Sequence, residues 1–195
     1  MKEKQVEFGD YIKVYDNVVI PELCQKLLNF FDLCKKTNYD NNHKRFSEIN
    51  VNDNSTFFPE FNRIVNIFAQ CAEAYRRDAP GTILMPPTMI MESIRIKKYQ
   101  PGGYYKNHID ARDANTMMRY LSMFIFLSDN GGIQFFNNKI QAEQGKVVCF
   151  PSNWMFPYNE YADDKIHYSM KSYLHFELPD VKKAREKRLM QDSDE

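Results

Sequence analysis

A histidine and an aspartate two residues apart are the side chains of this sequence best suited to hold a metal ion. They are His108 and Asp110, and they follow a Pro-Gly-Gly turn at 101–103 and a strand-like segment that ends at Tyr99. Residues two apart in an extended segment project to the same side. An imidazole and a carboxylate placed in this way supply two ligands of a 2-His-1-carboxylate site, which leaves positions open on non-heme Fe(II). We therefore predict that His108 and Asp110 are metal ligands.

The sequence around this pair makes the prediction more specific than a His-x-Asp pair alone, which arises easily by chance. Four blocks follow the pair in order, namely Arg119–Leu127, Gly131–Phe135, Gly145–Pro157 and Tyr168–Phe176. Their order resembles the prolyl-hydroxylase branch of the 2-oxoglutarate, Fe(II)-dependent oxygenases, particularly the short versions found in phages and bacteria. The resemblance covers roughly residues 85–178 and, more loosely, the segment Tyr11–Asn17.

The resemblance implies an enzyme that uses Fe(II) and 2-oxoglutarate to hydroxylate a peptide or another substrate at an unactivated C–H bond. It also implies a double-stranded β-helix with the metal site at its open end. Matched residue by residue, the second His ligand of the family falls at Tyr158 and the cation that holds 2-oxoglutarate falls at His167. A Tyr that assists 2-oxoglutarate in some relatives falls at Phe126. Tyr99 is the candidate catalytic residue beside the predicted metal pair.

Three positions of the implied site therefore carry residues that suit this chemistry poorly. An imidazole such as that of His167, with an ordinary pKa of about 6.5, is mostly uncharged at neutral pH and holds a carboxylate weakly. A phenol must lose a proton at a pKa of about 10 before it can bind iron, although phenolate is a known ligand of ferric iron. Tyr158 is thus kept as the third candidate metal ligand. The alternative function is a catalytically inactive relative that serves as a binding or structural module.

The last strand-like segment offers a second cation and a second alignment. Lys171 lies four residues beyond His167 and shares its face of an extended strand, so either Lys171 or a protonated His167 is a candidate to hold an acidic cosubstrate. A solvated strand face is the plainer interpretation of Lys171. If the alignment with the family pattern is shifted along the chain, His167 becomes the second metal ligand instead. The shift loses the match of Tyr168 and Ser169 to the family pattern.

Helical periodicity dominates the first part of the chain and strand-like segments dominate the rest. Apolar stripes predict one helix over about residues 21–38, opened by Pro21, and a second over about residues 59–78, with an Asn- and Asp-rich loop around His43 between them. Short β-branched and aromatic segments over about residues 90–178 predict antiparallel strands. The predicted fold class is α+β, with the helices supporting a β-sandwich that the resemblance sharpens to a double-stranded β-helix or jelly-roll.

The whole chain bounds the remaining possibilities. Its 195 residues show no break in composition and predict one domain over residues 1–179, followed by a charged tail over 180–195. The 26 Lys and Arg balance the 26 Asp and Glu, so no nucleic-acid partner is expected. No apolar run is long enough for a membrane span, and we expect a cytoplasmic protein without a membrane partner. The 4 cysteines lack metal-binding spacing and are expected to be reduced core thiols.

Overall fold

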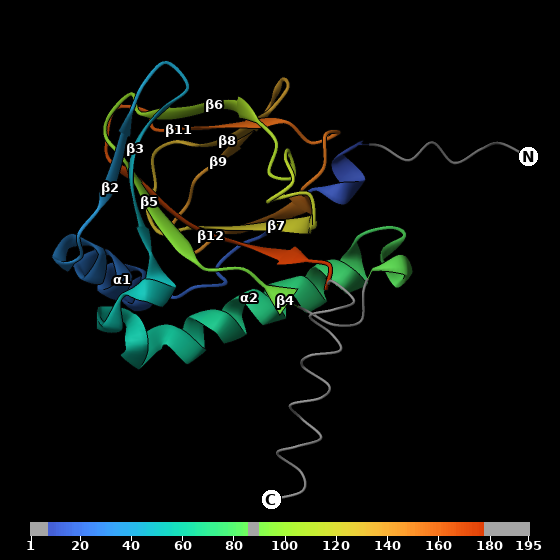
Figure 1. Cartoon of the computed structure of the whole chain (residues 1–195), viewed down its shortest axis with the longest axis horizontal. Helices are drawn as coiled ribbons and strands as arrows, with labels where there is room; N and C mark the ends of the chain where they lie inside the picture. The colour runs from blue at the N-terminus through green and yellow to red at the C-terminus, as the bar shows by residue number, and fades with distance from the viewer. Residues whose placement is uncertain (1–7, 86–89, 178–195) are drawn as a thin grey trace, which may run out of the picture.

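The computed structural model describes residues 8–85 and 90–177. Within these residues the strands form one 12-stranded antiparallel sheet. Its strands pair in the order β1-β10-β7-β12-β5-β3-β6-β11-β8-β9, with β2 added on β3 and β4 on β12. Figure 1 shows that the sheet curls, so that β6, β11 and β8 lie across from β5, β12 and β7. The strands are β1 (Lys13–Tyr15), β2 (Thr37–Asp40), β3 (Lys44–Asn50), β4 (Ile90–Met91), β5 (Arg95–Tyr99), β6 (Tyr104–His108), β7 (Arg119–Phe126), β8 (Gly132–Phe135), β9 (Asn138–Gln141), β10 (Val147–Pro151), β11 (Tyr158–Tyr161) and β12 (His167–His175).

Two α-helices, α1 (Pro21–Leu33) and α2 (Phe58–Asp78), support one layer of this sheet from outside (Figure 1). Pro21 lies in the first turn of α1, where its missing N–H costs no hydrogen bond. Apolar side chains of both helices meet those of the sheet in the main core, where Phe31, Ile64 and Met123 are fully buried. Short 3-10 helices lie at Phe8–Tyr11, Val51–Asp53, Ser55–Phe57 and Thr82–Leu84.

Strand β7 separates this main core from a second interior inside the curl. Its residues Met123 and Ile125 belong to the main core, whereas Phe124 and Phe126 belong to an inner cluster, because alternate residues of a strand point to opposite faces. The inner cluster consists of Phe124, Phe126, Ile133, Phe135, Ala142, Val148, Phe150, Phe156 and Tyr158. The inside of the curl therefore has an aromatic floor, above which polar side chains face the opening.

The predicted α+β class and the two helices are confirmed, but two details of the prediction are wrong. The first helix ends at Leu33 rather than near residue 38, because the last residue of its apolar stripe to be buried is Phe31 and Thr37–Asp40 form strand β2. The predicted loop around His43 is the turn of a β2–β3 hairpin, closed by the side chain of Asn41, which accepts hydrogen bonds from the backbone N–H groups of His43 and Lys44. Strands therefore also precede the second helix.

Three remaining features bear on the earlier expectations. All four cysteines are buried and free, as predicted for reduced core thiols. Within the described residues, no helix is both long enough and apolar enough to cross a membrane. The predicted charged tail over 180–195 lies outside the described residues.

Candidate functional site

The turn between β5 and β6 carries the chain from one layer of the sheet to the other and so positions the predicted metal pair. Gly102 adopts a left-handed conformation with φ of 67°, which glycine adopts without steric cost. Strand β6 then ends at His108, which is the register partner of Tyr158 on β11. Asp110 follows just after β6 and is 5% exposed. The three predicted metal ligands are thus brought together, with His108 Nε2 lying 4.0 Å from Asp110 Oδ1.

Asp110 is the centre of a closed hydrogen-bond network. Its Oδ1 accepts from Lys171 Nζ at 3.1 Å and from the Tyr173 hydroxyl at 3.0 Å, and its Oδ2 accepts from Ser122 Oγ at 2.7 Å. The Tyr158 hydroxyl donates to the same carboxylate, at 2.9 Å from Oδ2. Four donors from three strands therefore occupy the two oxygens of one buried carboxylate, and little capacity remains for another partner.

The charges at this centre reinforce one another. Burial alone would raise the pKa of Asp110, but the nearby Lys171 ammonium outweighs this and holds that pKa well below its usual range. The reciprocal attraction raises the pKa of Lys171 above its usual value, although burial opposes it. Burial, and then the Asp110 charge, raises the pKa of Tyr158 well above its usual value. At neutral pH the centre therefore consists of a carboxylate, an ammonium and a protonated phenol.

A second buried pair lies beside the first. Glu160 Oε1 accepts from Lys97 Nζ at 2.7 Å, and Glu160 Oε2 accepts from the Tyr99 hydroxyl at 2.6 Å. Burial would raise the pKa of Glu160, but Lys97 and Lys171 lower it to about 2. Burial lowers the pKa of Lys97 to about 8, a shift that Glu160 limits. Since Lys171 Nζ lies 3.6 Å from Glu160 Oε1, the two pairs form one network of two carboxylates and two ammonium groups.

Of the three predicted metal ligands, His108 is the one with a potential metal-binding atom that no other group occupies. Its Nδ1 lies 3.0 Å from the backbone carbonyl oxygen of Lys106, which requires Nδ1 to carry the proton and to donate. Burial lowers the pKa of His108 to about 3, so the ring is neutral. The other ring nitrogen, Nε2, then carries a lone pair and has no hydrogen-bond partner. It is buried and lies 4.0 Å from Asp110 Oδ1 and 4.0 Å from Glu160 Oε1.

The two candidates for holding an acidic cosubstrate, His167 and Lys171, have different surroundings. His167 is buried between the rings of Tyr99 and Phe126, whose centroids lie 5.9 Å and 5.6 Å from its own, and it does not line the pocket described below. Burial lowers the pKa of His167 to about 4, so its ring is neutral. Lys171 does line the pocket and carries a charge, but its ammonium is bound to Asp110 and to the Tyr158 hydroxyl.

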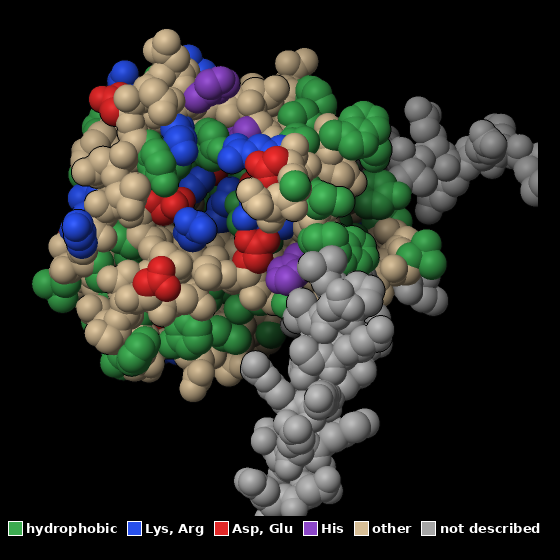
Figure 2. Space-filling model, in the orientation of Figure 1, with side chains coloured by type: hydrophobic (Ala, Val, Ile, Leu, Met, Phe, Trp, Pro, Cys, Tyr) green, Lys and Arg blue, Asp and Glu red, His purple; other side chains and the backbone are tan. Residues whose placement is uncertain are grey.

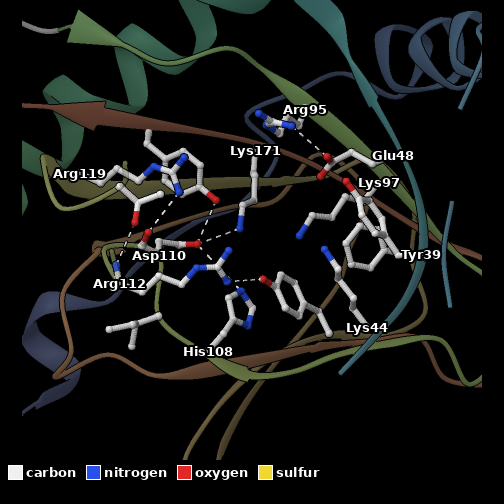
Figure 3. Close-up of a pocket in the computed structure, with 15 residues that line it drawn as sticks. Tyr39, Lys44, Glu48, Arg95, Lys97, His108, Asp110, Arg112, Arg119 and Lys171 are labelled. Carbon is white, nitrogen blue, oxygen red and sulfur yellow. Dashed lines mark hydrogen bonds and ion pairs between the residues drawn. The ribbon is translucent and has the colours of Figure 1, made fainter. Parts of the chain in front are cut away.

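A cavity of about 210 Å³ opens onto this polar network. Figure 3 shows that its walls come from the β2–β3 hairpin, from β5, from the end of β6 with the following loop, and from β12. Its lining residues are Tyr39, Lys44, Phe46, Glu48, Arg95, Lys97, Tyr105, His108, Ile109, Asp110, Arg112, Thr116, Arg119, Lys171 and Tyr173. Figure 2 shows Lys and Arg side chains gathered around a hollow on this face of the molecule.

Sequence reasoning did not identify Glu160, Lys97, Ser122 or Tyr173 as members of this network. The strand period carried a usable signal for Glu160, which lies two residues after Tyr158 and so shares its face. The same period applies to Lys97, which lies two residues before Tyr99. Ser122 gave no such signal, since it is a small polar residue inside a hydrophobic run.

Comparisons with known proteins agree with the geometry of the fold. A family model described as the 2OG-Fe(II) oxygenase superfamily matches residues 94–189. A prolyl-4-hydroxylase of Pseudomonas putida is similar in structure, with a TM-score of 0.65 and 12% identity, over 86% of this chain and 94% of the other. The viral collagen prolyl hydroxylase of Paramecium bursaria Chlorella virus-1, in its 2OG complex, gives a TM-score of 0.63 and 14% identity, over 85% and 96%.

A third similar structure is a prolyl hydroxylase from Trichoplax adhaerens in complex with a peptide fragment of hypoxia inducible factor. It has a TM-score of 0.63 and 12% identity, over 85% of this chain and 84% of the other. No curated protein matches the sequence.

The curled antiparallel sheet with its outer helices is thus a double-stranded β-helix of the kind found in prolyl hydroxylases, which confirms the predicted fold. By the family match, residues 94–189 belong to the 2OG-Fe(II) oxygenase superfamily, and the fold is prolyl-hydroxylase-like.

The residues present do not fit the Fe(II) and 2-oxoglutarate that this superfamily generally uses. His108 Nε2 is a suitable donor, but the oxygens of Asp110 are engaged and Tyr158 is a protonated phenol. No group of three or more His, Cys, Asp or Glu side chains in the described part of the chain is arranged to hold a metal ion. The ammonium of Lys171, 3.1 Å from Asp110 Oδ1, would also repel an incoming cation.

Proposed function

We propose that this chain is a catalytically inactive member of the superfamily whose pocket binds a ligand without a metal. The observation that carries the proposal is the position of Lys171. Its ammonium lies 3.1 Å from Asp110 Oδ1 and 2.8 Å from the Tyr158 hydroxyl, two of the groups that the family resemblance assigned to iron. A fixed positive charge from the chain itself thus balances the carboxylate that a metal would otherwise balance.

The cosubstrate side of the site supports the same proposal. A permanent cation is the residue type suited to a distal carboxylate, whereas His167 is neutral and buried outside the pocket lining. Lys97 and Lys171 are charged but are already paired with Glu160 and Asp110. One of the structural neighbours is described as a 2OG complex and another as a complex with a peptide, so ligand binding is a role that this fold can serve.

The second candidate function is an iron-dependent oxygenase that hydroxylates a peptide or another C–H substrate. In that case His108, Asp110 and Tyr158 hold iron, Tyr99 assists catalysis, and Lys171 or His167 holds the acidic cosubstrate. One observation favours it, namely the buried Nε2 of His108, which has no hydrogen-bond partner while Nδ1 is held by the carbonyl oxygen of Lys106.

Binding of Mn(II) to the whole chain, measured by electron paramagnetic resonance and calorimetry, separates the two functions. If the proposal is right, the parent and His108→Ala bind Mn(II) equally weakly, with a Kd above about 1 mM. Under anaerobic loading with Fe(II), followed by air, neither protein forms succinate from 2-oxoglutarate. Sub-millimolar Mn(II) binding that His108→Ala abolishes, or succinate formation that depends on His108, would refute the proposal and favour the oxygenase.

A further inference from the structure

The side chains that line the pocket carry more positive charge than negative charge. Six of its 15 lining residues are Lys or Arg and two are Asp or Glu. Figure 2 shows Lys and Arg side chains in and near the hollow, with some Asp and Glu side chains among them. An excess of like charge around a concave, partly enclosed space raises the local concentration of oppositely charged ligands.

Four of the six basic side chains are neutralised by acidic partners inside the fold. Lys171 pairs with Asp110 and Lys97 with Glu160. Arg119 makes a two-point contact with Glu92, with N–O distances of 2.7 Å and 2.6 Å, and Arg95 lies 3.0 Å from Glu48. These four basic residues are held by partners and have little free capacity for a ligand.

The other two basic residues, Lys44 and Arg112, lack such partners. Lys44 makes no ion pair with any residue in the described ranges 8–85 and 90–177. Arg112 reaches Asp113 at 3.4 Å, but both side chains of this pair are about half exposed, at 52% and 47%, so water screens it. The charge that is free to meet a ligand is therefore concentrated on these two residues.

Both of these side chains are oriented by an aromatic residue of the pocket wall. Lys44 Nζ lies 3.6 Å from the centroid of the Tyr39 ring, and Arg112 donates to the Tyr105 hydroxyl at 3.0 Å. The Tyr39 and Tyr105 rings both pack on Phe46, with centroids 5.0 Å and 5.6 Å away. Figure 3 shows Lys44 and Arg112 extending toward the cavity from different sides. Less side-chain freedom is lost on binding when donors are already held in this way.

From this arrangement we propose that the pocket binds a small dianion, such as a phosphate group or a dicarboxylate, between Lys44 and Arg112. Two cations without buried acidic partners match two negative charges, and a guanidinium binds either kind of oxyanion through paired N–H donors. The cavity of about 210 Å³ suits a small ligand. The proposal deepens the proposed function, because it names the ligand of the same metal-free pocket. It concerns the mouth of the pocket and not the buried His167.

Calorimetric titration of the whole chain with inorganic phosphate and, separately, with malonate tests the proposal. Both titrations are done in buffer from which metal ions have been removed beforehand, and at fixed ionic strength, because partly exposed charges are screened by salt. We expect the parent to bind at least one of the two dianions at sub-millimolar concentration. Lys44→Met and Arg112→Met should each weaken binding about tenfold, and Lys44→Arg should retain most of it. Which dianion binds identifies the chemistry of the ligand.

Lys139→Met is the matched control, because Lys139 also lies over a tyrosine ring, at 5.1 Å from the centroid of Tyr161, but outside the pocket. It should bind as the parent does. The proposal is overturned if the parent binds neither dianion, or if Lys44→Met and Arg112→Met bind as tightly as Lys139→Met. No metal takes part in these titrations, so their outcomes are independent of the Mn(II) test. An active iron site would be detected by Mn(II) binding or succinate formation, and not by the dianion titrations.

Discussion

Replacing Lys171 by Met tests the claim that a lysine of the chain supplies the positive charge at the centre of this site. Met has a similar length and no charge, so the variant removes the ammonium and leaves Asp110 with hydroxyl donors only. Removing one partner of a buried ion pair typically costs about 3–5 kcal/mol, because the other charge stays buried without compensation. The three remaining hydroxyl donors favour the lower end, and we expect a loss of about 3 kcal/mol in the free energy of unfolding near neutral pH.

The loss should depend on pH with a defined sign. In the parent, the pKa of Asp110 lies below its unfolded value of about 3.9, so its stabilising effect is present above that pH and declines as the pH falls through the folded pKa. Without Lys171, burial is no longer outweighed, and the folded pKa of Asp110 rises above the unfolded value. The variant is then penalised at neutral pH and relieved as the carboxylate becomes protonated. The stability difference between parent and variant should therefore shrink toward about pH 4.

Urea unfolding followed by circular dichroism, near neutral pH and near pH 4, measures this difference. The double variant Lys171→Met with Asp110→Asn should recover much of the stability and lose the pH dependence, since neither charge remains. Lys146→Met is the control, because Lys146 pairs with Glu143, which is 67% exposed, and should lose less than about 1 kcal/mol. A loss for Lys171→Met as small as that of the control, or one that is the same at both pH values, would refute the assigned role of Lys171.

Three further changes test other parts of the molecule by the same unfolding measurement. Tyr158→Phe removes one hydroxyl from the buried polar centre and should cost about 1–3 kcal/mol, whereas no measurable cost would mean that its hydrogen bonds do not form. Phe31→Ala should cost about 3–5 kcal/mol, because the fully buried ring leaves a cavity beneath helix α1, and a loss below about 1 kcal/mol would contradict its burial. Gly131→Ala should be clearly destabilising, since φ is 104° and the added Cβ would press on the carbonyl oxygen of Tyr161. The matched change Gly9→Ala meets nothing within 4 Å and should be nearly neutral, and equal effects at the two glycines would refute the strained turn.

The strand period made part of this site predictable. It placed His108 and Asp110 on one side of the chain, and it placed Lys171 on one face of β12. The plainer interpretation of that face as solvated was wrong, because Lys171 is 3% exposed and lines the pocket. The contact between Lys171 and Asp110 was not predictable in the same way, because 61 residues separate them and only the sheet order brings them together. A periodic pattern assigns a residue to one face of its own strand, but it does not say which strand of the curled sheet lies opposite that face.

The hairpin over the pocket was missed for a different reason. Strand β2 reads Thr37-Asn-Tyr-Asp40, and three of its four residues are exposed, so it shows no apolar alternation from which to recognise a strand. It forms because it pairs with β3, which in turn lies between β5 and β6. Lys44 and Tyr39 therefore reach the pocket from a segment that, in the sequence, resembles a polar loop.

The balance of buried charge is the physical reason for proposing a site without a metal. Asp110 and Glu160 contribute two negative charges, and Lys97 and Lys171 contribute two positive charges, all in side chains that are almost completely buried. The interior is thus neutral as it stands, and a divalent cation placed beside His108 would leave two positive charges without compensation. Because a buried unpaired charge is costly, such a cation could bind only if an ammonium group left the site or lost its proton. The neutral His108 ring is compatible with either arrangement, so its unpartnered nitrogen alone does not decide between them, and the proposal of a metal-free site rests on Lys171.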